Sequence, residues 1–117
     1  MAKVKIYHNP RCGKSRQTLA LLQERNLDIE IIEYLKDSPT AAELDALIAM
    51  LGKEPLEVMR TGEKLFKELG LSKKDERTRT EWIKIMSENP ILIERPIVVN
   101  NGQAALGRPP ENVLAIF

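Results

Sequence analysis

The fold is decided by the segment KVKIYHNPRCGKSRQTLALL, residues 3–22. Charged and apolar side chains alternate over residues 3–7, which predicts a short strand. Residues 8–13 contain several turn formers and interrupt this alternation. Helix-forming residues then predict a helix over residues 14 to about 25. This order places Cys12 at the amino terminus of a helix that follows a strand.

The next part of the chain predicts a second strand and a second helix. Residues 29–35 are rich in isoleucine and are expected to form a more buried strand. The order strand, helix, strand implies a right-handed parallel crossover. Thr40 and Glu43 have the spacing of a capping box, and Gly52 is expected to end the helix that they open.

The rest of the chain predicts helices and then a hairpin. Helical patterns occupy about residues 55–89, and Asn101-Gly102 is typical of a two-residue hairpin turn between apolar segments. A last short helix is expected to begin near Pro109. The predicted fold class is therefore α/β, with a mixed sheet of about four strands. We expect one domain over residues 1–117, with residues 55–89 as a helical insertion.

Composition and charge exclude several classes of protein. The 117 residues include 18 Lys and Arg against 17 Asp and Glu, a net charge of +1, so no nucleic acid partner is expected. The apolar stretches are too short for a membrane span and the amino terminus lacks a signal-peptide core, so we expect no membrane partner and a cytoplasmic location. One cysteine and one histidine predict no disulfide within the chain, no metal site and no bound cofactor.

Cys12 is the candidate nucleophile. The free N–H groups and the positive end of the expected helix favour its thiolate over its thiol. Arg11, Lys14 and Arg16 lie close in sequence and favour the charged form, and the Ser15 hydroxyl is placed to donate a hydrogen bond to the sulfur. The sequence therefore predicts a reactive cysteine.

Three arginines are the candidate partners of an anionic substrate. A thiolate that attacks an anion must overcome the repulsion of two negative charges, and guanidinium groups bind oxyanions through fixed pairs of donors. Arg60 lies at a predicted helix end, whereas Arg95 and Arg108 each precede a proline beside the predicted hairpin. Two arginines at one sheet edge are expected to converge.

The sequence resembles the glutaredoxin-coupled arsenate reductases, which have a thioredoxin-like fold, over nearly its whole length. The resemblance rests on four elements: His8-Asn9-Pro10-x-Cys12-x-x-Ser15-Arg16-x-Thr18-Leu19, then Arg60, then Asn89-Pro90-Ile91-Leu92-Ile93-x-Arg95-Pro96-Ile97-Val98-Val99, then Arg108-Pro109. It implies that Cys12 attacks arsenate and that Arg60, Arg95 and Arg108 surround the oxyanion.

The same resemblance implies the supporting groups and the partners. His8 and Ser15 are expected to steady the thiolate, and the bond before Pro96 is expected to be cis. Because the chain has one cysteine, an external thiol must resolve the arsenate ester on Cys12. Glutathione is expected as that co-substrate and glutaredoxin as the protein partner, in a role in arsenic detoxification.

The same residues bear on three other functions. A phosphatase-like loop needs an arginine six positions after the cysteine, but that position is Thr18. A glutathione-dependent thiol oxidoreductase acting on another substrate is consistent with the same residues. A regulator of the same fold that binds RNA polymerase is the third alternative, against which Ser15 counts because such regulators typically carry a second cysteine at that position.

Overall fold

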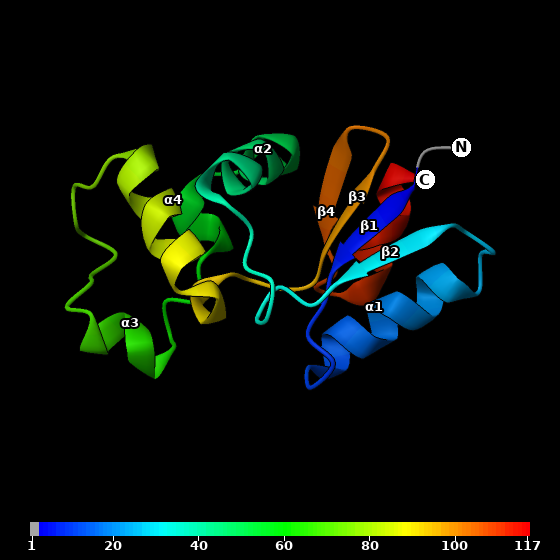
Figure 1. The fold of residues 1–117 in the computed structure, drawn as a ribbon, viewed down its shortest axis with the longest axis horizontal. Coiled ribbons are helices and arrows are strands. Elements are labelled where there is room, and N and C mark those ends of the chain that lie inside the picture. Colours follow the sequence, from blue (N-terminus) through cyan, green and yellow to red (C-terminus); the bar gives the residue numbers. More distant parts are fainter. Residues whose placement is uncertain (1–2) are drawn as a thin grey trace. The chain divides into compact units, whose positions relative to one another are not determined.

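The computed structural model describes residues 3–117, which divide into two compact units (Figure 1). The first unit contains the described residues up to Asp37 together with Arg95–Phe117, and the second contains Ser38–Glu94. The predicted α/β class with a mixed four-stranded sheet is confirmed. The single-domain organisation stays a prediction.

The sheet of the first unit has the order β2-β1-β3-β4. β1 (Val4–Tyr7) pairs in parallel with β2 (Ile29–Ile32) and antiparallel with β3 (Ile97–Asn100), with Ile6 opposite Ile31 and Val98. β3 pairs antiparallel with β4 (Gln103–Leu106). β1 and β2 are joined by α1 (Gly13–Gln23), so the predicted parallel crossover is confirmed as a parallel pair.

The hairpin between β3 and β4 has the predicted turn. Asn101 and Gly102 have φ angles of 55° and 79°, and a turn with two positive φ values matches the twist of antiparallel strands. The hairpin places the residues before β3 and after β4 at one end of the sheet, because Ile97 is opposite Leu106.

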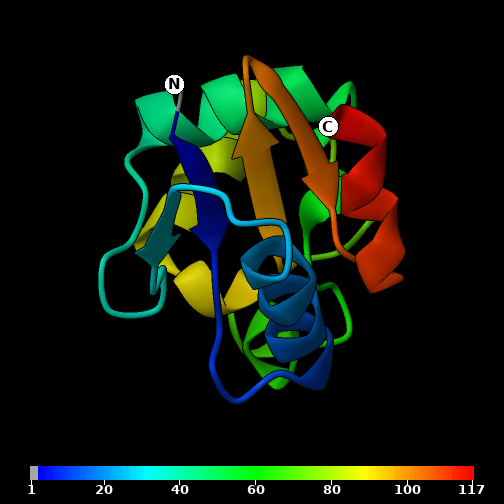
Figure 2. The same ribbon diagram turned by 90° about the vertical axis from the view of Figure 1, so that its right-hand side faces the viewer.

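The core of the first unit lies between the sheet and two helical segments. α1 and the 3₁₀ segment η3 (Pro110–Ile116) lie beside each other against the strands (Figure 2). One cluster of buried side chains joins sheet, helix and 3₁₀ segment: Val4, Ile6, Leu22, Val98 and Val113. This packing fixes α1, and with it the loop that carries Cys12, against β1.

The second unit is helical. It contains α2 (Ala41–Leu51), α3 (Lys64–Glu68) and α4 (Arg79–Glu88), with the 3₁₀ turns η1 (Pro55–Val58) and η2 (Pro90–Leu92).

Both long helices of the second unit begin with capping boxes. Thr40 accepts the Glu43 N–H at 3.1 Å in α2, and Thr78 accepts the Glu81 N–H at 3.2 Å in α4. Gly52 ends α2 in the left-handed conformation, as its position predicts.

The prediction for the second strand is wrong in two respects. β2 ends at Ile32 rather than at residue 35, because residues 33–37 form turns in which Lys36 and Asp37 donate to the Glu33 carbonyl. The strand is also not more buried, since it lies at the sheet edge and Ile31 is 47 % exposed. An apolar run does not by itself distinguish a central strand from an edge strand.

None of the helices found over residues 3–117 has both the length and the apolar character that a membrane crossing requires.

Candidate active site

Cys12 is the N-cap residue of α1, as the sequence predicts. Its backbone is extended, with φ −96° and ψ 123°, and its N–H donates to the Asn9 carbonyl at 3.0 Å. Its side chain makes no capping hydrogen bond and is partly exposed as a free thiol. The sulfur therefore lies at the positive end of an 11-residue helix without being used to hold that helix.

Ser15 and His8 form a buried pair beneath the loop that carries Cys12. The Ser15 hydroxyl lies 2.6 Å from His8 Nδ1 and accepts the Asn9 N–H at 3.0 Å. Both side chains are buried. The expectation that Ser15 hydrogen-bonds the sulfur is not met, since these two groups are its observed partners. Ser15 thus acts on the loop that precedes Cys12.

Burial governs the charge of His8. It lowers the pKa of His8, Arg16 lowers it further, and Glu33 opposes these effects by raising it. The folded protein therefore favours the neutral ring. Neutral imidazole keeps one nitrogen as an acceptor, which suits the hydrogen bond with the Ser15 hydroxyl.

The loop before Cys12 is held on its exposed side as well. Arg16 Nη1 donates to the Pro10 carbonyl at 3.0 Å, and the Arg11 N–H donates to Asn9 Oδ1 at 3.0 Å. Arg16 therefore holds the loop in place through this hydrogen bond, a role that the sequence did not reveal. Its positive charge lies close to the nucleophile in the chain and favours an anion there.

The loops that carry Arg95 and Arg108 lie together, as the sequence predicts for two residues at one sheet edge. Arg108 Nη1 donates to the Arg95 carbonyl at 3.4 Å. The peptide bond from Arg95 to Pro96 is cis, as the resemblance implies, and so is the bond from Arg108 to Pro109. The Gly107 N–H donates to the Pro96 carbonyl at 2.9 Å, so the two arginine loops are hydrogen-bonded directly.

Gly107 brings these loops against α1. A Cβ added at Gly107 would lie 2.7 Å from Pro96 Cγ and would collide with the hydroxyl of Thr18. Thr18 is fully buried and lies six residues along α1 from Cys12, which is about 9 Å of helix. The arginine loops therefore pack on the same helix that Cys12 opens.

Sequence reasoning missed Gly107 and Thr18 as positioning residues. Gly107 stands directly after β4, and a glycine at a strand end is a recognised signal of close backbone approach. Thr18 carried no such signal, because a threonine inside a helix is more often exposed. Its hydroxyl donates to the Lys14 carbonyl at 2.8 Å within the helix.

Arg60 lies in the second unit and is held by two carboxylates. Its guanidinium is 2.6 Å from Glu63 and 3.8 Å from Glu94, and its N–H donates to the Leu92 carbonyl at 2.7 Å. These ion pairs fix the side chain and offset its charge locally. That Arg60 joins Cys12 around an oxyanion stays a prediction.

Residues 3–117 contain no group of three His, Cys, Asp or Glu side chains placed to hold a metal ion. The first unit holds a thiol at a helix start, a buried Ser–His pair that fixes the loop before it, and two arginine-bearing loops that contact each other and the same helix. This arrangement suits nucleophilic attack by sulfur on an anion.

Comparisons with known proteins agree over almost the whole chain. The model of the ArsC family matches residues 7–116. An Escherichia coli K12 protein named "Uncharacterized protein YfgD" is 50 % identical over 115 residues, 97 % of this chain and 96 % of its own. An arsenate reductase from Neisseria meningitidis serogroup A is 42 % identical over 118 residues, which cover 100 % of both chains. The structure of an arsenate reductase from Vibrio cholerae has a TM-score of 0.93 at 49 % identity, over 98 % of both chains.

Proposed function

The chain belongs to the ArsC family, and on that premise we propose that it is an arsenate reductase that uses Cys12 as nucleophile, glutathione as co-substrate and glutaredoxin as partner. The observation that carries the proposal is Cys12 at the start of α1, in a chain similar over its full length to proteins named arsenate reductases. We expect the reaction to take place in the cytoplasm, where glutathione keeps thiols reduced.

The first step of the proposed reaction is attack by the Cys12 thiolate on arsenic. A sulfur–arsenic bond forms, and one hydroxyl of arsenate takes up a proton and leaves as water. Repulsion between the thiolate and the arsenate oxygens opposes this step. Arg95 and Arg108 would lower that repulsion, because guanidinium groups from two converging loops can donate to the oxygens as charge develops. Arg60 is expected to join them.

The second step requires a thiol from outside the chain. The sequence contains one cysteine, so glutathione would attack the Cys12 sulfur of the ester. A sulfur–sulfur bond forms and the sulfur–arsenic bond breaks with its electron pair left on arsenic. Arsenic is thereby reduced by two electrons and leaves as arsenite, while the two sulfurs become a mixed disulfide.

Glutaredoxin would complete the cycle. Its thiolate attacks the glutathione sulfur of the mixed disulfide, so that glutathione is transferred to glutaredoxin and the Cys12 thiolate is restored. His8 and Ser15 support both attacks by holding the loop before Cys12 in place.

The test is arsenite release by the purified protein with arsenate, glutathione and glutaredoxin. We expect no release when arsenate or glutathione is omitted or in Cys12→Ser, and release of only one arsenite per chain when glutaredoxin is omitted. Undiminished arsenite release by Cys12→Ser would overturn the proposal. Thiol–disulfide exchange with glutathione disulfide, in the absence of any arsenite release, would instead favour a glutathione-dependent thiol oxidoreductase with another substrate.

A further inference from the structure

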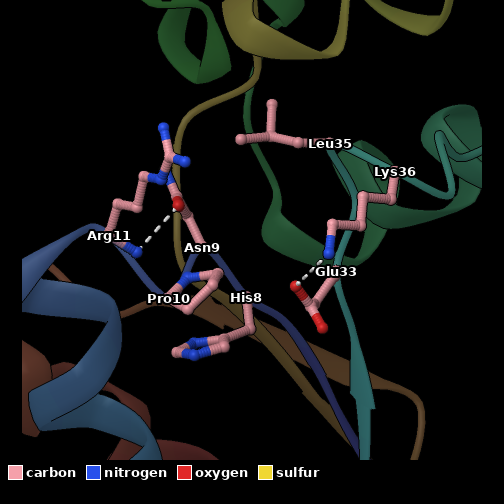
Figure 3. A pocket seen from close by; sticks show the side chains of 7 residues that line it. All are labelled: His8, Asn9, Pro10, Arg11, Glu33, Leu35 and Lys36. Atoms are coloured by element: carbon pink, nitrogen blue, oxygen red, sulfur yellow. Dashed lines mark hydrogen bonds and ion pairs between the residues drawn. The ribbon is translucent and has the colours of Figure 1, made fainter.

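A cavity beside the Cys12 loop has no role in the steps described above. It has a volume of about 280 Å³ and lies within the first unit (Figure 3). Two loops form it, the one after β1 and the one after β2. Its lining consists of His8, Asn9, Pro10, Arg11, Glu33, Leu35 and Lys36.

The cavity lies where a ligand could reach the nucleophile. β1 and β2 are parallel, so the loops that follow them leave the same edge of the sheet, the common position of ligand sites in such sheets. The loop after β1 leads directly from the lining residue Arg11 to Cys12. A molecule in this cavity would therefore lie next to the loop that presents the sulfur.

The lining of the cavity combines positive, negative and apolar side chains. Arg11 and Lys36 provide two cations, Glu33 provides one carboxylate, and Leu35 is an apolar side chain that is 42 % exposed. In Figure 3, Arg11 extends from one wall, and Leu35 and Lys36 lie on the other. The lining thus matches a flexible ligand with two carboxylates, one ammonium and an apolar or thiol-bearing centre.

The ion pair between the two charged lining residues of the loop after β2 is weak. Lys36 Nζ lies 3.7 Å from Glu33 Oε1, and their side chains are 82 % and 45 % exposed. A pair this long and this exposed contributes little to folding. Lys36 and Glu33 can therefore each give up this ion pair and bind a ligand instead, at a small cost in free energy.

We propose that this cavity is the binding site of glutathione, with Arg11 and Lys36 on its two carboxylates and Glu33 on its ammonium group. The inference rests on the glutathione step of the proposed function. It adds the location of the co-substrate, on the β2 side of the Cys12 loop. The bound thiol then approaches Cys12 from the cavity, and the reaction that follows is the two-electron transfer already written.

Lys36→Ala tests the site by kinetics, because Lys36 is in a different loop from the nucleophile. We expect the KM for glutathione to rise about fivefold or more, as for the loss of one charged contact, with the KM for arsenate unchanged. With 2-mercaptoethanol, which carries no carboxylate, the rate should be the same as in the parent protein. Lys3→Ala, at the opposite end of β1, is the matched control and should change neither the KM for glutathione nor the rate with 2-mercaptoethanol.

An unchanged KM for glutathione in Lys36→Ala would overturn the site. So would an equal loss of rate with both thiols, because that result would indicate a structural effect. A defect confined to the glutaredoxin step would also overturn it, because the surface would then contact the partner protein.

Direct binding separates this inference from the proposed function. S-methylglutathione has no free thiol, so its binding depends on neither arsenate nor turnover. In NMR titrations we expect saturable shifts of the amides of Asn9, Arg11, Glu33 and Lys36, weakened in Lys36→Ala. Shifts centred on the amides of Ile97 and Gly107, or no saturable binding, would overturn the cavity as the site. A protein that fails to release arsenite but binds S-methylglutathione here would lose the proposed function and keep this site.

Discussion

Ser15 joins the start of α1 to the strand that precedes it. Its hydroxyl contacts the ring of His8 at the end of β1 and the N–H of Asn9 in the intervening loop. Because Ser15 is fully buried, water cannot replace these contacts. The position that carries a second thiol in dithiol oxidoreductases is used here to fix the loop of a single thiol.

His8 gives the protein a predictable dependence on pH. Its pKa is lowered, mainly by burial, so as the pH falls the unfolded chain takes up a proton before the folded chain does. The free energy of unfolding should therefore decrease as the pH falls below about 6.5. Urea unfolding from about pH 7.5 to about pH 5.5 measures this decrease, and His8→Gln should flatten it.

The two carboxyl groups whose pKa values are shifted do not obscure this measurement. The pKa values of Asp75 and Glu81 are lowered, chiefly by backbone hydrogen bonds from Ser72 and Thr78, so both stay ionised over that range. An equally steep decrease in His8→Gln would show that His8 is not the group responsible.

Arg108 is the arginine whose removal should most directly affect the oxyanion. It is exposed and lies on the Arg95 carbonyl, in a loop packed toward α1. Arg108→Ala should cost about 2–4 kcal/mol of transition-state stabilisation, measured as kcat/KM for arsenate. Arg25→Ala, at the far end of α1 beside Phe117, is the matched control and should leave that ratio unchanged. Equal kinetics for the two variants would remove Arg108 from the site.

At the scale of elements, the approach of the arginine loops to α1 depends on one missing Cβ. Gly107→Ala places a methyl group against Pro96 and Thr18, and overpacking of this kind costs about 1–3 kcal/mol of stability. We also expect lower arsenate reduction, since Arg108 must shift with its neighbour. Gly62→Ala is the control, because a Cβ there meets nothing within 4 Å. Chemical denaturation compares the two; similar losses would contradict the close packing at Gly107.

Signals within a few residues of one another were enough to predict most elements. Thr40 with Glu43 gave the start of α2, Asn101-Gly102 gave the hairpin, and the turn before Cys12 gave the start of α1. In each case the hydrogen bonds or φ angles that the backbone requires at that point are supplied by residues close by in the sequence. The helical period gave α2 and α4 for the same reason.

Features that depend on residues distant in sequence were the ones missed. The exposure of β2 follows from its place at the sheet edge, which the strand itself does not encode. The contact of Gly107 with Thr18 joins positions 89 residues apart. The ion pair of Arg60 with Glu94 joins positions 34 residues apart, so local spacing predicted the arginine and not this carboxylate.

For the whole molecule, charge and cysteine content restrict the chemistry. A net charge of +1 leaves no general attraction for anions, so the positive groups around Cys12 must act locally. One cysteine leaves no internal thiol to resolve an ester on Cys12. Both facts make the account depend on a single intermediate, the mixed disulfide of Cys12 with glutathione.

Mass spectrometry of the protein after one turnover tests that intermediate most directly. With arsenate and glutathione present and glutaredoxin omitted, we expect one glutathione per chain, attached to Cys12 and formed in step with released arsenite. Addition of glutaredoxin should remove it. Equal labelling of Cys12 without arsenate, or arsenite released while Cys12 stays unmodified, would contradict the account.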